Sequence, residues 1–336
     1  MVGWQQGGVC EPAAKSDTSS AGTCRKVNLA ASHGQPGILR WRTVIFAAAL
    51  VLLLDAKELF AWGPATHVQL ANDVLRNLGL LPAAVAALLG RHAVDYIYGC
   101  VAADVVFAKR LSRIKQSCHH WSTGFGLLKR ADSDRGRAFA YGYLSHLAAD
   151  TVAHGKFVPR QIMLTRSTVS FGHVYWEMRA DQLAPESAPD QLRAFSAYNF
   201  DVHHRELSGM LLETFLPYQM NREVFARINA LMGREGWRRG MEIVNRCSRW
   251  ALHPDILQAY HGECVDRTLS LLAEEHRSPV LAEDPNGSAA LACSRINRRQ
   301  LRRLKRRGLP WQQRAHELAA GWAPQDRLHP SAAVPA

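Results

Sequence analysis

Several features that would indicate other kinds of protein are missing from this sequence of 336 residues. The seven cysteines contain no CxxC pair, which excludes a cysteine-based zinc module. No turn dipeptide lies between runs of alternating apolar and polar residues, so β-hairpins are not expected. The apolar run Val44–Leu54 is too short to cross a bilayer, which takes about 20 residues. What remains is the composition of a globular protein, with 47% hydrophobic and 21% charged residues.

Residues 1–61 have the character of a leader. Arg40 and Arg42 precede the apolar run, and a short polar stretch that ends in Ala61 follows it. This order is typical of a secretory signal segment, here residues 40–61. We therefore predict cleavage after Ala61 and an exported protein, whether secreted, periplasmic or attached to the envelope. An uncleaved signal anchor is the alternative.

Helical periodicity dominates the chain after the leader. Apolar residues recur three and four positions apart in each strongly patterned segment. These segments are Thr66–Leu80, Pro82–Val106, Tyr141–Val158, Phe171–Leu183, Gln191–Leu216, Arg222–Ala251 and Ile256–Glu275. The sequence therefore predicts one all-α, multi-helix domain over residues 62–278.

Residues 279–336 form a basic C-terminal stretch. Its segment Arg295–Arg307 reads RINRRQLRRLKRR and contains eight basic residues and no acid. Ile296, Leu301 and Leu304 supply only a narrow apolar stripe, which favours a flexible, solvated tail. Because the whole chain has a net charge of +12, adsorption of this tail to an anionic membrane surface is the functional alternative.

Two of the predicted helices carry histidines and carboxylates four residues apart. A helix turns by about 100° per residue, so residues at this spacing share one face. Leu, Ala, Val, Tyr and Trp fill most of the remaining positions, which places the polar side chains in a packed interior. The residues concerned are His146, Asp150, His154, His173 and Glu177.

Burying so many ionisable groups is costly unless they are paired or bind a metal. Mixed imidazole and carboxylate ligands favour zinc, so the sequence predicts a zinc site between these helices. The alternative is a buried network of ion pairs without a metal. In such a network the cost of burying the charged groups would exceed the stabilisation that their ion pairs usually provide.

A further motif, WGPATH, begins at the expected cleavage point. As the first mature residue, Trp62 would offer its α-amino nitrogen and carbonyl oxygen to a metal, with His67 five residues later. With the fragments GCVAADVV, HHW, SHLAADTVAH and HVYWE, it makes the chain resemble the zinc-dependent phospholipase C family from Trp62 to about Asp181. That family shares its fold with the zinc nuclease/3′-nucleotidases and with the N-terminal domain of glycosylphosphatidylinositol-specific phospholipase D.

The resemblance implies an all-α catalytic domain in which three zinc ions lie in a cleft between helices. Carried over to this chain, the ligands are Trp62, His67, Asp104, His120, His146, Asp150, His154, His173 and Glu177. In this arrangement Asp150 bridges the ion at Trp62 and His67 to the second ion. Asp104 would also orient or deprotonate the attacking water, which makes it the expected catalytic residue.

Three assignments stay open at this stage. His154 follows Asp150 by four positions, as in the phospholipase D pattern, whereas the secreted bacterial phospholipases have a step of six. Either His119 or His120 matches the HHW motif; we prefer His120, because Trp121 follows it directly. Asp181 continues the face of His173 and Glu177; it could support the site, but we expect an ordinary surface acid.

The expected activity is that of a hydrolase acting on phosphoric ester bonds. We predict a zinc-dependent phosphodiesterase that cleaves phospholipids by the C-type or D-type reaction through metal-activated water. A zinc-dependent single-strand nuclease/3′-nucleotidase is the alternative; a weakly active membrane-binding zinc module is another. The expected partner is a phospholipid or membrane surface, with nucleic acid only under the nuclease alternative. No protein partner is implied, so a monomer is expected.

Overall fold

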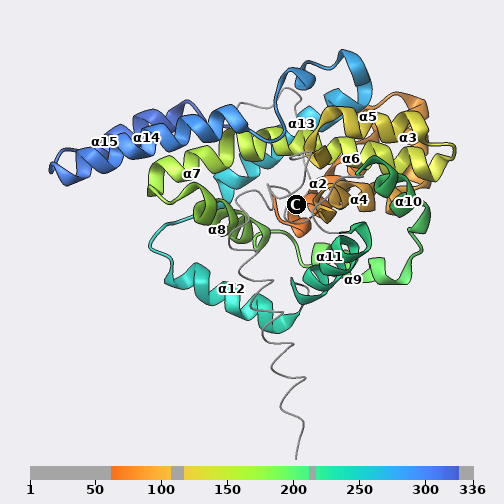
Figure 1. Ribbon diagram of the computed structural model, residues 1–336, viewed down its shortest axis with the longest axis horizontal. Helices are drawn as coiled ribbons and strands as arrows, with labels where there is room; N and C mark the ends of the chain where they lie inside the picture. Colours follow the sequence, from red (N-terminus) through yellow and green to blue (C-terminus); the bar gives the residue numbers. More distant parts are fainter. Residues whose placement is uncertain (1–61, 107–116, 212–216, 233, 325–336) are drawn as a thin grey trace, which may run out of the picture. The chain divides into compact units, whose positions relative to one another are not determined.

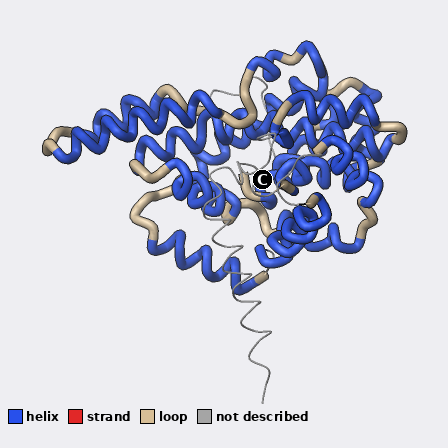
Figure 2. The backbone as a smooth tube through the Cα atoms, in the orientation of Figure 1, coloured by secondary structure: helices blue, strands red, loops and turns tan. Residues whose placement is uncertain are grey.

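The computed structural model describes residues 62–106, 117–211, 217–232 and 234–324. These residues form helices joined by short loops, and no strand occurs among them (Figures 1 and 2). The all-α prediction is therefore confirmed. The leader and signal segment lie outside the described residues. None of the described helices combines the length and apolar character that crossing a membrane requires.

Helices α4 (Ala93–Ala102) and α6 (Asp134–Val152) cross at the centre of the domain. A Cβ atom at Gly99 would lie 2.1 Å from the Phe139 carbonyl oxygen, and one at Gly142 would lie 2.0 Å from that of Tyr96. Only glycine allows the two backbones to approach so closely. Because nearly every residue of α6 is buried, this helix can present polar side chains to an interior site.

The surrounding helices cover this central pair. Helix α2 packs on α4, while α5 and α13 pack on α6. Helix α8 packs on α7. The bounds of these helices are α2 Pro64–Arg76, α3 Ala83–Arg91, α5 Trp121–Arg130, α7 Val158–Thr165, α8 Val169–Asp181 and α13 Pro254–Glu274.

The long helical segments predicted from the sequence are broken into shorter helices. Residues 82–106, for example, form α3, α4 and a 3₁₀ turn, with a break at His92, whose backbone is not helical. The predicted segments Gln191–Leu216 and Arg222–Ala251 divide in the same way, whereas Ile256–Glu275 forms the single helix α13. The helices of the divided segments are α9 Ser187–Ala194, α10 Asp201–Met210, α11 Tyr218–Met232 and α12 Glu235–Cys247.

The helix that carries His146 is interrupted directly before His154. After Val152 the chain makes a π-helical turn, Ala153–Phe157, and then continues as α7. The expectation of one uninterrupted α-helix through His154 is therefore wrong. A π turn places more residues in one turn than an α-helix does, so it changes the direction of the side chains within it.

The C-terminal stretch differs from the expected flexible tail. After a 3₁₀ turn at Pro279–Ala282 it forms helices α14 (Ser288–Arg306) and α15 (Trp311–Ala320). Both helices pack on α7 (Figure 1). Leu301 is fully buried in an apolar cluster with Met163. The basic segment thus uses its narrow apolar stripe for packing, since a partner face is available on α7.

Candidate metal centre

Four parts of the fold direct ionisable side chains into one buried region. Helix α2 contributes one residue, the loops on either side of the undescribed residues 107–116 contribute two, α6 with its π turn three, and α8 two. Each of these side chains has at most 6% of its surface exposed. They are His67, Asp104, His119, His146, Asp150, His154, His173 and Glu177.

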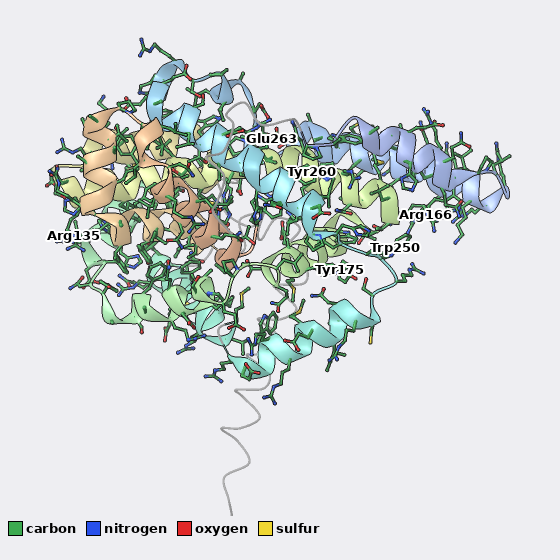
Figure 3. All side chains as sticks on the ribbon, turned by 180° about the vertical axis from the view of Figure 1, so that it is seen from behind. Arg135, Arg166, Tyr175, Trp250, Tyr260 and Glu263 are labelled. Atoms are coloured by element: carbon green, nitrogen blue, oxygen red, sulfur yellow. The ribbon has the colours of Figure 1, made fainter. Side chains whose placement is uncertain are left out.

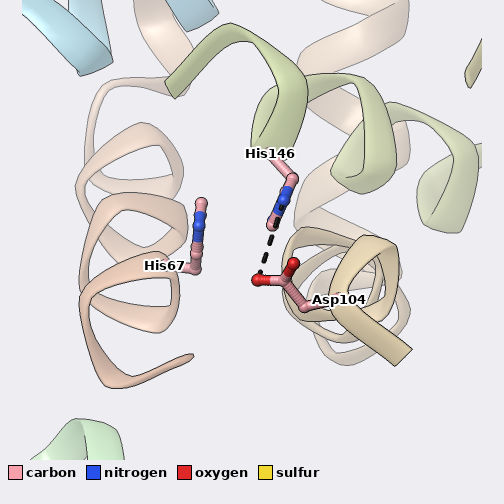
Figure 4. A group of neighbouring side chains, drawn as sticks. All are labelled: His67, Asp104 and His146. Atoms are coloured by element: carbon pink, nitrogen blue, oxygen red, sulfur yellow. Dashed lines mark ion pairs between the residues drawn. The ribbon is translucent and has the colours of Figure 1, made fainter. Parts of the chain in front are cut away.

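The first group joins His67, Asp104 and His146 (Figure 4). Their ligand atoms all lie within 4.8 Å of one another. The two imidazole rings stack with centroids 3.9 Å apart, and His146 Nε2 is 3.9 Å from Asp104 Oδ2. Two imidazoles and a carboxylate at this separation form a ligand set that suits zinc.

The second group joins Asp150 with His119 and His146, and Asp150 also faces His67, so it lies among three imidazoles. Its Oδ1 is 3.5 Å from His67 Nε2, and its Oδ2 is 3.1 Å from His119 Nε2 and 3.2 Å from His146 Nε2. Burial alone would raise the pKa of Asp150, but the surrounding imidazoles hold it well below its ordinary value. The carboxylate is therefore charged, and each of its oxygens faces a different part of the site.

The structure brings His119, and not His120, into the site. His119 ends a 3₁₀ turn, Ser117–His119, and its Nε2 lies 3.4 Å from Asp104 Oδ1. His120 is the residue before α5, has an extended backbone, and exposes its side chain. The preference for His120 is thus corrected. Adjacent residues point in different directions, and the turn before α5 decides which imidazole faces inward.

The last group consists of His154, His173 and Glu177, as the sequence predicted. The rings of His154 and His173 lie edge to face with centroids 4.8 Å apart. On α8, His173 Nε2 is 2.5 Å from Glu177 Oε1. The four-residue step from Asp150 to His154 reaches this group because the π turn carries His154 towards α8.

Two backbone carbonyls fix the orientation of the imidazoles on α6 and its π turn. His146 Nδ1 donates to the Cys100 carbonyl at 2.8 Å, and His154 Nδ1 donates to the Pro285 carbonyl at 2.6 Å. A hydrogen bond at Nδ1 leaves Nε2 as the ligand atom. The Cys100 carbonyl is available because it lies in the last turn of α4, where carbonyls lack helical partners. These supports were not foreseen, since sequence motifs do not reveal main-chain acceptors.

The loop 283–287 before α14 supports the site from a second direction as well. Asn286 Nδ2 donates to the His119 carbonyl at 3.1 Å, while Pro285 accepts from His154. Helix α13, which carries Glu263 (labelled in Figure 3), also holds the π turn, since Glu263 forms an ion pair with Lys156 in that turn. Arg267 links the same Glu263 to Thr151 on α6.

The residues of this region fit zinc. Burial, together with the nearby His146, lowers the pKa of His67 to about 4, and burial lowers that of His154. Both imidazoles are therefore neutral at pH 7, the form that binds metals. The Nε2 atom of His154 is buried and has no hydrogen-bond partner among the described residues. A cation at this atom would satisfy it and would balance the buried carboxylates.

The number of ions stays a prediction. Three groups of ligands can be drawn within this region, but the first two share His146. Trp62 is fully buried, and its ring stacks on Phe157 with centroids 4.6 Å apart. The expected α-amino ligand depends on a cleavage next to Ala61, which lies outside the described residues. Trp62 does stand at the start of α2, five residues before His67.

Asp181 supports α2 from the end of α8. Its Oδ1 accepts a hydrogen bond of 2.7 Å from the backbone nitrogen of Thr66, next to His67. It therefore caps the first turn of α2, whose amides have no helical partners. The expectation of a surface acid is therefore wrong, because Asp181 is buried and bonded to the start of α2. Burial raises the pKa of Asp181 to about 6.

We expect Asp181→Asn to change the pH dependence of stability. A carboxyl whose pKa is raised in the folded protein stabilises the fold below its unfolded pKa, and this contribution is lost as pH rises through about 6. A shift from 3.8 to about 6 corresponds to roughly 3 kcal/mol. Urea unfolding of zinc-free protein should show the variant gaining that much relative to the parent between pH 4 and pH 7. The exposed Asp255→Asn is the matched control; an equal response in both variants would contradict the assignment.

Gly287 allows the supporting loop to touch the π turn. Its φ is +57°, and an added Cβ atom would lie 2.3 Å from the His154 carbonyl oxygen. We expect Gly287→Ala to displace His154 and weaken zinc binding at the last group by about 10- to 100-fold, measured by titration with a zinc chelator. Gly308 has a similar φ of +67° with nothing within 4 Å, so Gly308→Ala controls for backbone strain. Equal zinc affinity in the two variants would refute the prediction.

The comparison with known families agrees with this geometry. Residues 66–215 match the family described as zinc dependent phospholipase C. No curated protein and no solved structure matches the chain. The matched segment contains every described candidate ligand from His67 to Glu177, whereas the supporting Pro285 lies beyond it. The resemblance expected from the sequence is confirmed over these residues.

Proposed function

Because residues 66–215 match the zinc-dependent phospholipase C family, we propose that this protein hydrolyses the phosphodiester bonds of phospholipids. One observation carries the proposal: eight buried imidazoles and carboxylates from four parts of the fold face one another in three potential ligand groups. Burying this many imidazoles and carboxylates together is costly unless a metal binds them, and apolar side chains of similar volume would often stabilise the fold as well or better.

The residues of the chain have distinct roles in this reaction. His146 and His154 present Nε2 to the site, since backbone carbonyls hold their Nδ1 atoms. Asp150 faces imidazoles with both oxygens and keeps the first two groups together. Zinc held by these groups would supply Lewis acidity, which lowers the pKa of a water molecule and offsets negative charge on the phosphoryl oxygens.

Asp104 is the proposed catalytic carboxylate. It follows α4 in a 3₁₀ turn, so a short loop and not a regular helix holds it, and only 3% of its surface is exposed. Its two oxygens lie 3.4 Å from His119 and 3.9 Å from His146. From this position the carboxylate can orient an attacking water and accept its proton while still contributing to the ligand set.

A substrate panel tests the proposal and separates its alternatives. Zinc-loaded full chain is incubated with phosphatidylcholine vesicles and, separately, with single-stranded DNA. Release of diacylglycerol and a phosphorylated head group with intact DNA supports C-type phospholipid cleavage. Phosphatidic acid as the product would identify the D-type reaction. Cleavage of DNA with intact lipid would overturn the proposal in favour of a nuclease, and binding of vesicles without any cleavage would favour the weakly active zinc module.

We also propose that the protein is exported and that its mature chain begins at Trp62. The basis is the order of charges and apolar residues in the segment 40–61 and the position of Trp62 before α2. N-terminal sequencing of the exported protein, with zinc determination on the same sample, tests this. A chain that keeps its leader and yet binds the same amount of zinc would exclude Trp62 as an N-terminal ligand.

A further inference from the structure

Positively charged side chains gather where α7 meets α14 and α15, apart from the candidate metal centre. It is formed by arginines from the end of α7 and from α14, with one more from the loop after α12. We call it the arginine cluster and define it as Arg166, Arg249, Arg298, Arg299 and Arg302. Among the described residues, none of these five forms an ion pair with a carboxylate.

Arg166 is held in an unusual position. It follows the last residue of α7 with a left-handed backbone, φ +53°, a conformation that residues other than glycine seldom adopt. Its guanidinium lies over the ring of Trp311 at 3.9 Å, and its carbonyl accepts a hydrogen bond of 3.0 Å from Arg298 Nε. The cation–π contact and this hydrogen bond fix two arginines side by side.

Two donors of the cluster are buried and unsatisfied. Arg166 Nε and Arg298 Nη2 are inaccessible and have no hydrogen-bond partner in the described part of the chain. Burial and the neighbouring arginines lower the pKa of both side chains. Like charges held together around buried donors are unfavourable unless an anion joins them.

We propose that the arginine cluster is a binding site for a phosphate group, distinct from the metal centre. Guanidinium groups bind phosphate through paired hydrogen bonds, and a phosphate offers enough acceptors for several arginines at once. The group can belong to an anionic phospholipid or to a soluble phosphate. In the first case the site would hold the enzyme at the surface where its proposed substrates lie, and this consequence rests on the proposed function.

The site is built on a rigid base. Met163 of α7, Leu301 of α14 and Ala315 of α15 are all buried in one apolar cluster beneath it. Arg298 and Arg302 flank Leu301 on α14 at a spacing of four residues, so they share one face of the helix. Arg298 is half-buried and bonded to α7, whereas the other basic residues of α14 are exposed.

The test compares two double variants of the full, zinc-loaded chain. R298Q/R302Q removes two charges from the cluster, and R303Q/R306Q removes two exposed charges from the same helix. Sedimentation with phosphatidylcholine vesicles, with and without phosphatidic acid, measures lipid binding; the thermal shift on adding inorganic phosphate measures binding of the soluble ion. General attraction of basic residues to an anionic surface should affect both variants equally, because each loses two charges.

We expect the cluster variant to lose at least about tenfold more affinity for phosphatidic acid vesicles than the control variant, since only the cluster variant loses charge-assisted hydrogen bonds to the phosphate. A phosphate-dependent thermal shift that only the cluster variant loses, without a difference on vesicles, would assign the site to a soluble phosphate. Equal losses in both variants, or none, would overturn the proposal.

Two further measurements keep this test independent of the others. Circular dichroism checks that R298Q/R302Q is folded. If this double variant is unfolded, R302Q alone, which changes an exposed residue, is compared with the parent and the control variant instead. Turnover of a soluble, monomeric phosphodiester should be unchanged in each variant. Because binding is read without turnover, a failure of the phospholipase proposal would leave the result for the arginine cluster interpretable.

Discussion

Replacing Asp150 with asparagine should lower turnover by at least about 10³-fold, because its carboxylate lies against imidazoles of both of the first two ligand groups. The carboxylate faces His67 with one oxygen and His119 and His146 with the other. An amide keeps the size of the side chain but offers only one acceptor and no charge. The expected readout is the kcat for a soluble phosphodiester, measured together with the zinc content of the same sample.

Asp255→Asn is the matched control for this variant. It makes the same chemical change at an exposed position in the first turn of α13. We expect its turnover and zinc content to equal those of the parent. If Asp150→Asn kept near-normal turnover, Asp150 could not connect the two groups, and the proposed metal centre would have to be redrawn around the remaining ligands.

The second large effect concerns the two adjacent histidines before α5. His119→Ala should lower turnover by at least about 10²-fold, since its imidazole faces Asp104, His146 and Asp150 in the interior. His120→Ala should change turnover by no more than about threefold, because substitution of an exposed side chain usually changes the free energy of unfolding by less than about 0.5 kcal/mol.

This pair decides between the sequence-based preference and the structure. The two variants remove the same group from neighbouring positions, so each serves as the control for the other. Zinc content should fall only in His119→Ala. The reverse result, a loss at His120 alone, would mean that the turn before α5 has the other imidazole directed inward in the active protein.

The spacing of polar residues on helices was sufficient to predict most of the site. His146 and Asp150 lie one turn apart on α6, and His173 and Glu177 do so on α8, because a helix fixes the direction of each side chain. The all-α class follows from the same periodicity. These are local properties, which is why the sequence reveals them.

The errors occurred where the direction of a side chain depends on irregular backbone or distant contacts. The choice between His119 and His120 depends on a 3₁₀ turn that no helical rule describes. The order of the basic tail depends on an apolar face of α7 more than a hundred residues earlier in the chain. The main-chain acceptors at Cys100 and Pro285 have no sequence motif, because any residue can provide a carbonyl.

The loop that touches both His119 and His154 has a consequence for where the functional unit ends. Pro285 and Asn286 come after the last residue of the expected domain, and also after the segment that matches the family. A protein shortened at residue 278 would therefore keep every described candidate ligand side chain and yet lose the carbonyl that holds the His154 imidazole and the amide that holds the His119 main chain. The predicted catalytic domain would then end before the residues that complete its candidate metal centre.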